Sequence, residues 1–192
     1  MMLSWKKQPP AAWAAGFALS IGLGASYGLF GNLVVNLVSA LTGVTSGASA
    51  GPLLESSPGF WILVMVVIAP VLEELLFRKL LYGACRKRLP AFAAALVTSV
   101  LFGVLHLDLL QGLYAFVFSL FLCMIAEETC NWYFCAAAHF AANLLAVLLA
   151  LFAEGSGLFE GIQLPWILAS AAVLAVFTIL IFRFGRGLSR AS

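Results

Sequence analysis

Long apolar runs alternate with short polar segments along the whole chain. The runs consist almost entirely of aliphatic, aromatic and small residues, and they cover 11–44, 60–82, 91–107, 113–126, 132–152 and 164–182. Several of them approach or exceed the roughly 20 residues that a helix needs to cross a bilayer. None shows the alternation of apolar and polar positions that is typical of a membrane β-strand. The pattern therefore predicts an all-α, polytopic membrane helix bundle of about six transmembrane helices.

The composition agrees with a membrane protein. Of the 192 residues, 64% are hydrophobic and 9% are charged, with a mean hydropathy of +1.08, whereas a soluble domain carries about 25% charged residues. The sequence shows no repeat and no sign of a second domain, so we expect one membrane domain over residues 1–192. The net charge of +2 is too small to indicate a nucleic-acid partner. The expected surroundings are the lipid bilayer.

The basic residues indicate an orientation. With six crossings, all the basic clusters fall on one side of the membrane: Lys6 and Lys7, Arg86 to Arg88, and Arg183 to Arg190. The opposite loops carry Glu55, Asp108, Glu154 and Glu160 but no Lys or Arg. By the positive-inside rule we expect a multi-pass protein of the inner (plasma) membrane with both termini in the cytoplasm. The first apolar run far exceeds the roughly 7–15 residues of a signal peptide, so we expect an uncleaved helix.

Small residues recur every fourth position in the first predicted helix. Gly16, Ser20, Gly24 and Gly28 would form a ridge on one face that lets another helix approach closely. We expect this ridge to pack inside the bundle, and a homodimer interface is the alternative.

Three charged residues stand in the second predicted helix. Glu73, Glu74 and Arg78 follow an unbroken apolar run from Phe60 to Leu72, and a charge inside the bilayer costs about 2.5–3.5 kcal/mol on insertion scales. Glu74 and Arg78 are four residues apart and can pair on one face of the helix, while Glu73 points roughly 100° away. We therefore expect Glu74 to be structural and Glu73 to be free for chemistry. The alternative is a set of helix-end charges that extend towards water.

The only two histidines, His106 and His139, also lie in predicted membrane helices. Ionisable groups inside a membrane usually face one another or a wet cavity, so we expect these imidazoles to meet the acidic residues in one polar pocket. His139 and Asn143 share a helix face, and both can donate hydrogen bonds to a carbonyl oxygen that gains charge. A carboxylate and the other imidazole could hold and deprotonate a water molecule.

Three motifs occur in order on successive predicted helices. They are Glu73-Glu74-x-x-x-Arg78, Phe102-x-x-x-His106 and His139-x-x-x-Asn143. In this order they resemble the motifs of the CAAX-protease and bacteriocin-processing (CPBP, Abi-type) family of intramembrane endopeptidases. The resemblance covers a catalytic core at about residues 71–149.

The resemblance implies a peptidase and assigns a role to each motif residue. Glu73 and His106 would activate the attacking water, His139 and Asn143 would stabilise the oxyanion, and Glu74 with Arg78 would form a supporting ion pair. The implied substrate is a membrane-associated peptide or protein, either prenylated, as for CAAX processing, or of the bacteriocin and signal-peptide type. A peptide-binding immunity protein of the same fold, without enzymatic activity, is one alternative. A small proton-coupled transporter is another, because Glu and His pairs also build proton relays.

The cofactor requirement is open at this stage. Glu73, His106 and His139 could bind a divalent metal such as Zn²⁺ with water as the fourth ligand, and the resembled family has been described as metal-dependent. However, the three ligands come from three helices and lack the His-Glu-x-x-His spacing of many such sites. We therefore expect that no metal or other cofactor is required and that Glu73 activates the water.

The predicted depths of two site residues disagree. Glu73 lies roughly 20 Å along its helix from Phe60 at about 1.5 Å per residue, whereas His106 lies near the opposite end of the third helix if that helix begins at Ala91. We expect one of two solutions. Either the third helix starts later or tilts, or the turn over 107–112 is buried and draws His106 inward.

Overall fold

The computed structural model describes residues 10–45, 56–152 and 163–190. Lys6, Lys7, Glu55, Glu154 and Glu160 therefore lie outside the described residues. The described part is helical and contains no β-strand. Its elements are α1 (Pro10–Thr42), α3 (Pro58–Leu63), η1 (Val64–Ile68), α4 (Ala69–Glu74), η2 (Leu75–Tyr82), α5 (Gly83–Cys85), α6 (Ala91–Val104), α7 (Leu109–Thr129), α8 (Trp132–Phe152) and α9 (Leu164–Arg190).

The predicted fold class is confirmed. Within the described residues, five helices are long and apolar enough to cross a membrane: Ala12–Thr42, Pro58–Cys85, Leu109–Thr129, Trp132–Phe152 and Leu164–Leu188. The sixth, α6, has 14 residues and is about 21 Å long at about 1.5 Å per residue, which is shorter than the hydrocarbon core of about 30 Å. Helix α6 ends at Val104 because the chain turns at Leu107, whose φ is +55°. Asp108 is the N-cap of α7, and its side chain accepts a hydrogen bond from the Gln111 N–H.

The second membrane helix is continuous from Pro58 to Cys85 but contains two π-helical segments, η1 and η2. In η1 and η2 the backbone bonds join residues five apart, while α3, α4 and α5 have the usual spacing of four. Single π-helical turns of this kind often occur at functional sites. Here they lie directly before and after the segment that carries Glu73 and Glu74.

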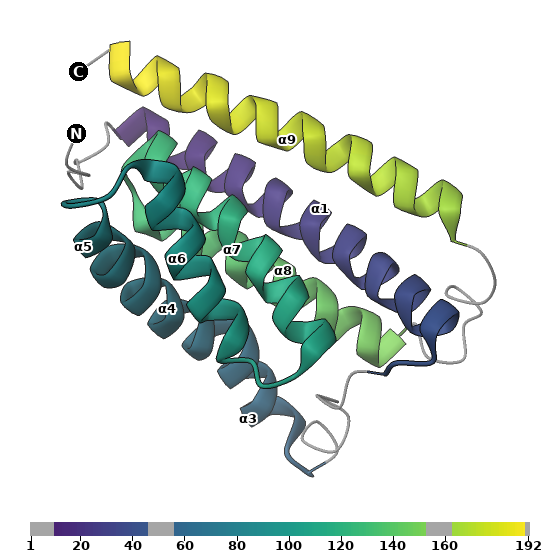
Figure 1. Ribbon diagram of the computed structural model, residues 1–192. Helices are drawn as coiled ribbons and strands as arrows, with labels where there is room; N and C mark the ends of the chain where they lie inside the picture. The colour runs from purple at the N-terminus through teal and green to yellow at the C-terminus, as the bar shows by residue number, and fades with distance from the viewer. Residues whose placement is uncertain (1–9, 46–55, 153–162, 191–192) are drawn as a thin grey trace.

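The helices form a bundle in which α7 and α8 occupy the middle (Figure 1). The first helix, α1, packs on α8 and α9, while α6 packs on α7. The helix of α3 to α5 lies on the opposite side of the bundle from α9 (Figure 1), where it contacts α6, α7 and α8. This arrangement brings the three motif-bearing helices, α4 with η2, α6 and α8, to the same side.

The small-residue ridge of α1 packs inside the bundle, as expected. A Cβ atom on Gly24 would collide with the backbone carbonyl of Ala138, and one on Gly28 would lie 3.1 Å from the carbonyl oxygen of Ala142. Gly16 faces the ring of Phe134 in the same way. The ridge therefore fixes how closely α1 approaches α8, the helix that carries His139.

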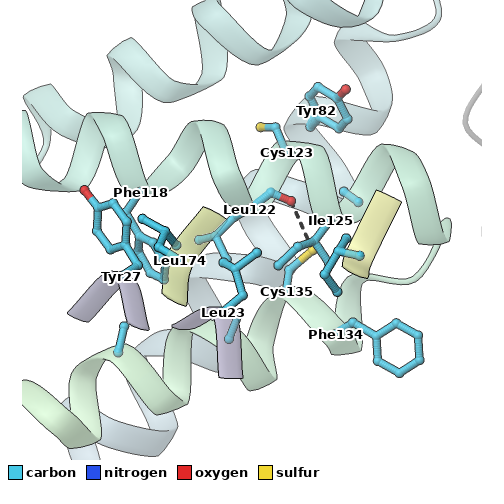
Figure 2. Close-up of a cluster of buried hydrophobic side chains, with 14 of the residues drawn as sticks. Leu23, Tyr27, Tyr82, Phe118, Leu122, Cys123, Ile125, Phe134, Cys135 and Leu174 are labelled. Atoms are coloured by element: carbon cyan, nitrogen blue, oxygen red, sulfur yellow. Dashed lines mark hydrogen bonds between the residues drawn. The ribbon is translucent and has the colours of Figure 1, made fainter. Parts of the chain in front are cut away.

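A tightly packed apolar core fills the centre of the bundle (Figure 2). Tyr27 of α1 stacks on Phe118 of α7 with ring centroids 4.7 Å apart, and the Cys135 thiol donates to the Leu122 carbonyl at 3.3 Å. Phe118 in turn packs edge-on against the His139 ring at 5.4 Å between centroids. The apolar core is thus continuous with the polar site.

Candidate active site

Glu74 and Arg78 form the ion pair that their spacing predicts. Nε of Arg78 lies 3.0 Å from Oε2 of Glu74, and neither side chain has any exposed surface. A pair this deeply buried is stable only when its members also have further partners. For Glu74 that partner comes from another helix.

His139 is held between the two glutamates. Its Nδ1 lies 2.8 Å from Oε1 of Glu74, and because an ion-paired carboxylate can only accept, the imidazole donates here. On the other side of the ring, Nε2 lies 3.7 Å from Oε2 of Glu73, which is longer than a hydrogen bond. Nε2 is therefore directed towards Glu73 but remains available to another atom.

The two glutamates differ sharply in access. The Glu73 side chain is 36% exposed, whereas that of Glu74 is completely buried. The difference follows from the helix: position 74 faces α8 and the ion pair, and position 73 is rotated away from it. This agrees with the sequence-based division between a structural and an available carboxylate.

The ring of Phe102 joins the charged residues to His106. The Arg78 guanidinium lies over this ring with its central carbon 4.9 Å from the centroid, a cation–π contact that favours the buried charge. The ring centroid is 5.0 Å from that of His106 and 5.9 Å from that of His139. The two imidazoles therefore lie on the same aromatic side chain, no farther apart than the sum of these two distances.

The third helix does not start later than predicted, and the turn that follows it is not buried throughout. Helix α6 does begin at Ala91, and the segment over 107–112 is buried only in part, because Leu107 is 91% exposed whereas Leu110 is 7% exposed. Instead the imidazole folds back along its own helix, with Nδ1 2.8 Å from the Phe102 carbonyl oxygen. Helical side chains point towards the N-terminus of their helix. The ring thereby comes within electrostatic reach of Glu73.

Asn143 lies one turn after His139 on α8, and its carboxamide binds the backbone of another helix. Its Nδ2 donates to the carbonyl of Met65 in η1 at 2.8 Å. A carboxamide has two N–H groups and one oxygen, so one donor is used here and the rest of the group stays available. The spacing of the motif did not reveal this contact.

The residues that would bind a metal do not fit that task in this arrangement. Within the described ranges, no three His, Cys, Asp or Glu side chains are grouped closely enough to share an ion. Nδ1 of His139 and Nδ1 of His106 both have protein partners, so only the Nε2 atoms of the two rings could bind an ion. A three-ligand zinc site from Glu73, His106 and His139 would need these side chains to move together.

The structure also identifies residues that sequence reasoning left without a role. Phe102 appeared only as the first position of a motif, yet it contacts Arg78 and both imidazoles. Met65 and Pro70 carry no functional group that a motif search would select. Their signal was a proline within an apolar helical run, which indicates an irregular backbone.

Comparisons with known proteins match the part of the chain that contains the site. Residues 55–145 match the model of the family described as Type II CAAX prenyl endopeptidase Rce1-like. A stretch of 48 residues, 25% of this chain, is 44% identical to the Bacillus subtilis (strain 168) protein named "Putative membrane peptidase YdiL". The matched stretch spans a fifth of the length of that relative, 20%. No solved structure matches the chain.

These findings define a multi-pass helical membrane protein. The resemblance that the three ordered motifs predicted is confirmed: residues 55–145, which hold all three motifs, match the model of the Rce1-like CAAX prenyl endopeptidase family.

Proposed function

We propose that this protein is an intramembrane endopeptidase that hydrolyses a peptide bond of a membrane-associated substrate. The observation that carries the proposal is the placement of His139 between two glutamates, one completely buried and one 36% exposed. A merely structural ion pair would not need a second, accessible carboxylate beside the same imidazole. The family match over the same residues supports this reading.

Each side chain has a role in the proposed reaction. Glu73, with His106, accepts a proton from a water molecule as the water oxygen attacks the carbonyl carbon of the scissile bond. The imidazolium form of His139 carries a proton on each ring nitrogen, so it donates from Nδ1 to Glu74 and from Nε2 to the carbonyl oxygen as that oxygen becomes an oxyanion. The free N–H of Asn143 donates to the same oxygen. Glu73 then returns the proton to the leaving amine when the carbon–nitrogen bond breaks.

Glu74 and Arg78 act through His139. Glu74 accepts from Nδ1 and so fixes the ring with Nε2 towards Glu73, while Arg78 holds the carboxylate in place. Because neither side chain is exposed, neither is placed to touch a substrate. Both are positioning residues.

The surroundings of Glu73 favour a substrate that arrives from the membrane. Leu72 and Leu76, its neighbours along the helix, are 58% and 53% exposed on the outer surface of a membrane-spanning segment. A peptide with a lipid group or an apolar end would reach Glu73 along such a surface without leaving the bilayer. Prenylated proteins and precursors of secreted or signalling peptides both have this chemistry.

Glu73→Gln tests the proposal because it keeps the shape of the side chain and removes the base. Purified parent and variant would be reconstituted in liposomes with a set of prenylated and unprenylated membrane peptides, and new peptide termini would be identified by mass spectrometry. We expect cleavage by the parent and a loss of at least a hundredfold in Glu73→Gln, consistent with the usual contribution of about 10²–10⁴-fold from a general base. Glu128→Gln, in α7, is the matched control and should cleave normally. Equal cleavage by Glu73→Gln and the parent would refute the mechanism.

We also propose that the protein lies in the plasma membrane with both termini in the cytoplasm. The end of α5 and the end of α9, which precede or carry the arginine clusters, lie at the same end of the bundle (Figure 1). Reporter fusions at residue 192 that are active only in the cytoplasm would support this orientation, and periplasmic or extracellular activity would contradict it.

A further inference from the structure

The carbonyl of Met65 lacks its expected backbone partner. In the π-helical register of η1, each carbonyl accepts from the N–H five residues later, as Val64 does from Ala69. The next carbonyl is that of Met65, and the residue five positions later is Pro70. Proline has no N–H, so this carbonyl receives no backbone hydrogen bond from position 70.

The side chain of Asn143 in α8 supplies the hydrogen bond that Pro70 cannot donate. Its Nδ2 donates to the Met65 oxygen at 2.8 Å across the helix interface. Within a membrane an unpaired carbonyl costs several kcal/mol, so the contact strongly restrains the carboxamide. Asn143 lies one helical turn from His139 and would otherwise be free to rotate.

We propose that Pro70 is a positioning residue of the active site. By withholding an N–H, it reserves the Met65 carbonyl for Asn143, and this contact fixes the orientation in which the remaining N–H of Asn143 meets the substrate oxygen. Pro70 is itself buried and lies three residues before Glu73 on the same helix. This role rests on the proposed function of Asn143 as an oxyanion donor.

A purely structural role for Pro70 makes a different prediction. Proline inside a helix is unfavourable, and its replacement by alanine normally stabilises the helix. If Pro70 only bends the backbone, Pro70→Ala should change activity and stability together. If Pro70 reserves the carbonyl, the new N–H at position 70 competes with Asn143, and catalysis falls without a loss of stability.

Steady-state kinetics of four proteins test the proposal: parent, Pro70→Ala, Asn143→Ala and the double variant. We expect Pro70→Ala to lower kcat about tenfold, short of the 10²–10³-fold typical for complete loss of one oxyanion donor, with KM within twofold of the parent and an unfolding midpoint no lower. The double variant should be no slower than Asn143→Ala alone. Parental kcat in Pro70→Ala, or losses that multiply in the double variant, would overturn the proposal.

Two additional variants serve as a substitute and as a control for this comparison. Pro70→Leu also restores the N–H and replaces Pro70→Ala if the alanine variant does not fold. Pro58→Ala removes a proline from the exposed first turn of α3, so it should leave kcat unchanged. A tenfold loss in Pro58→Ala would show that any proline removal in this helix impairs the enzyme, which would overturn a specific role for Pro70.

A measurement of stability tests the contact without relying on cleavage. Asn143→Ala should lower the midpoint of thermal unfolding in the parent, because Met65 loses its partner. The loss should be smaller in the Pro70→Ala background, where the N–H of Ala at position 70 can take the carbonyl. An equal loss of the unfolding midpoint in both backgrounds would overturn the claim that Pro70 reserves the Met65 carbonyl for Asn143. If the parent protein cleaves no peptide, the proposed function is refuted instead. The stability comparison would still test whether Pro70 leaves the Met65 carbonyl to Asn143.

Discussion

Glu74 and His139 are 65 residues apart in the chain, yet Oε1 of the first lies 2.8 Å from Nδ1 of the second. The same carboxylate binds Arg78 through its other oxygen at 3.0 Å. The buried Glu74 carboxylate therefore pairs with the guanidinium of its own helix and accepts a hydrogen bond from the imidazole of α8. This relationship connects the stability of the bundle to the orientation of the imidazole in the site.

Replacement of Glu74 should separate stability from activity. Glu74→Gln leaves the buried guanidinium uncompensated, and breaking a buried pair in this way costs about 3–5 kcal/mol. Replacing both members, as in Glu74→Leu with Arg78→Met, should recover most of that stability because no lone charge remains. Activity should stay low in both variants, because Gln offers the His139 N–H only a neutral acceptor in place of the carboxylate and Leu offers none. Thermal unfolding in detergent and the peptide assay measure the two effects, and a double variant less stable than Glu74→Gln would contradict the argument.

Phe102 should matter more than its apolar character suggests. Phe102→Leu removes the face on which Arg78 lies and the ring between the imidazoles, so we expect a loss of about 1–3 kcal/mol from the cavity and the cation–π contact. Catalysis should fall as His106 loses its support. Phe92→Leu on the same helix is the control, because Phe92 is 77% exposed. Similar unfolding midpoints for the two variants would argue against this role.

Two glycines should respond to alanine in opposite directions. Gly24→Ala places a methyl group against the Ala138 backbone, and overpacking of this kind costs about 1–3 kcal/mol. Gly187→Ala in α9 meets no neighbour and should stabilise its helix by about 0.5–1 kcal/mol. Thermal unfolding of the two variants checks both signs. A Gly24→Ala protein as stable as the parent would mean that α1 can move away from α8.

Glu127 should anchor the end of the second membrane helix. It accepts from Arg86 at 2.9 and 2.7 Å and from the Tyr82 hydroxyl at 2.9 Å. Tyr82→Phe removes one hydrogen bond to a charged group, which is worth about 1.5–3 kcal/mol. Tyr133→Phe is the control because Tyr133 is 50% exposed. Unfolding midpoints that do not distinguish the two variants would show that the hydroxyl adds nothing to the Arg86 ion pair.

Metal removal should leave the proposed peptidase activity intact. The proposed mechanism uses Glu73 and His106 on water, and the described His, Cys, Asp and Glu side chains are not grouped to hold an ion. We therefore expect parental cleavage after dialysis against a chelator, measured beside an untreated sample. A loss that added Zn²⁺ restores would instead favour ligation by Glu73, His106 and His139.

Much of this protein follows from sequence alone because the information is local. Length and hydropathy gave the membrane helices to within a few residues, with two exceptions. Helix α7 begins four residues earlier than predicted and continues through Glu127 to Thr129, and α9 continues to Arg190, eight residues beyond its predicted end. The spacing of four residues gave the Glu74–Arg78 pair, because neighbours on one helix are fixed by its pitch. Motif order gave the resemblance to the family whose model matches residues 55–145.

Contacts between helices required the tertiary structure. No periodicity shows that Glu74 meets His139, that Asn143 meets Met65, or that Phe102 lies between the imidazoles, because each depends on how two helices are rotated and shifted against each other. Those rotations are set by close packing, as where Gly24 and Gly28 meet the α8 backbone. The sequence thus determined which polar residues the membrane helices carry, and the packing of the helices decided which of them touch.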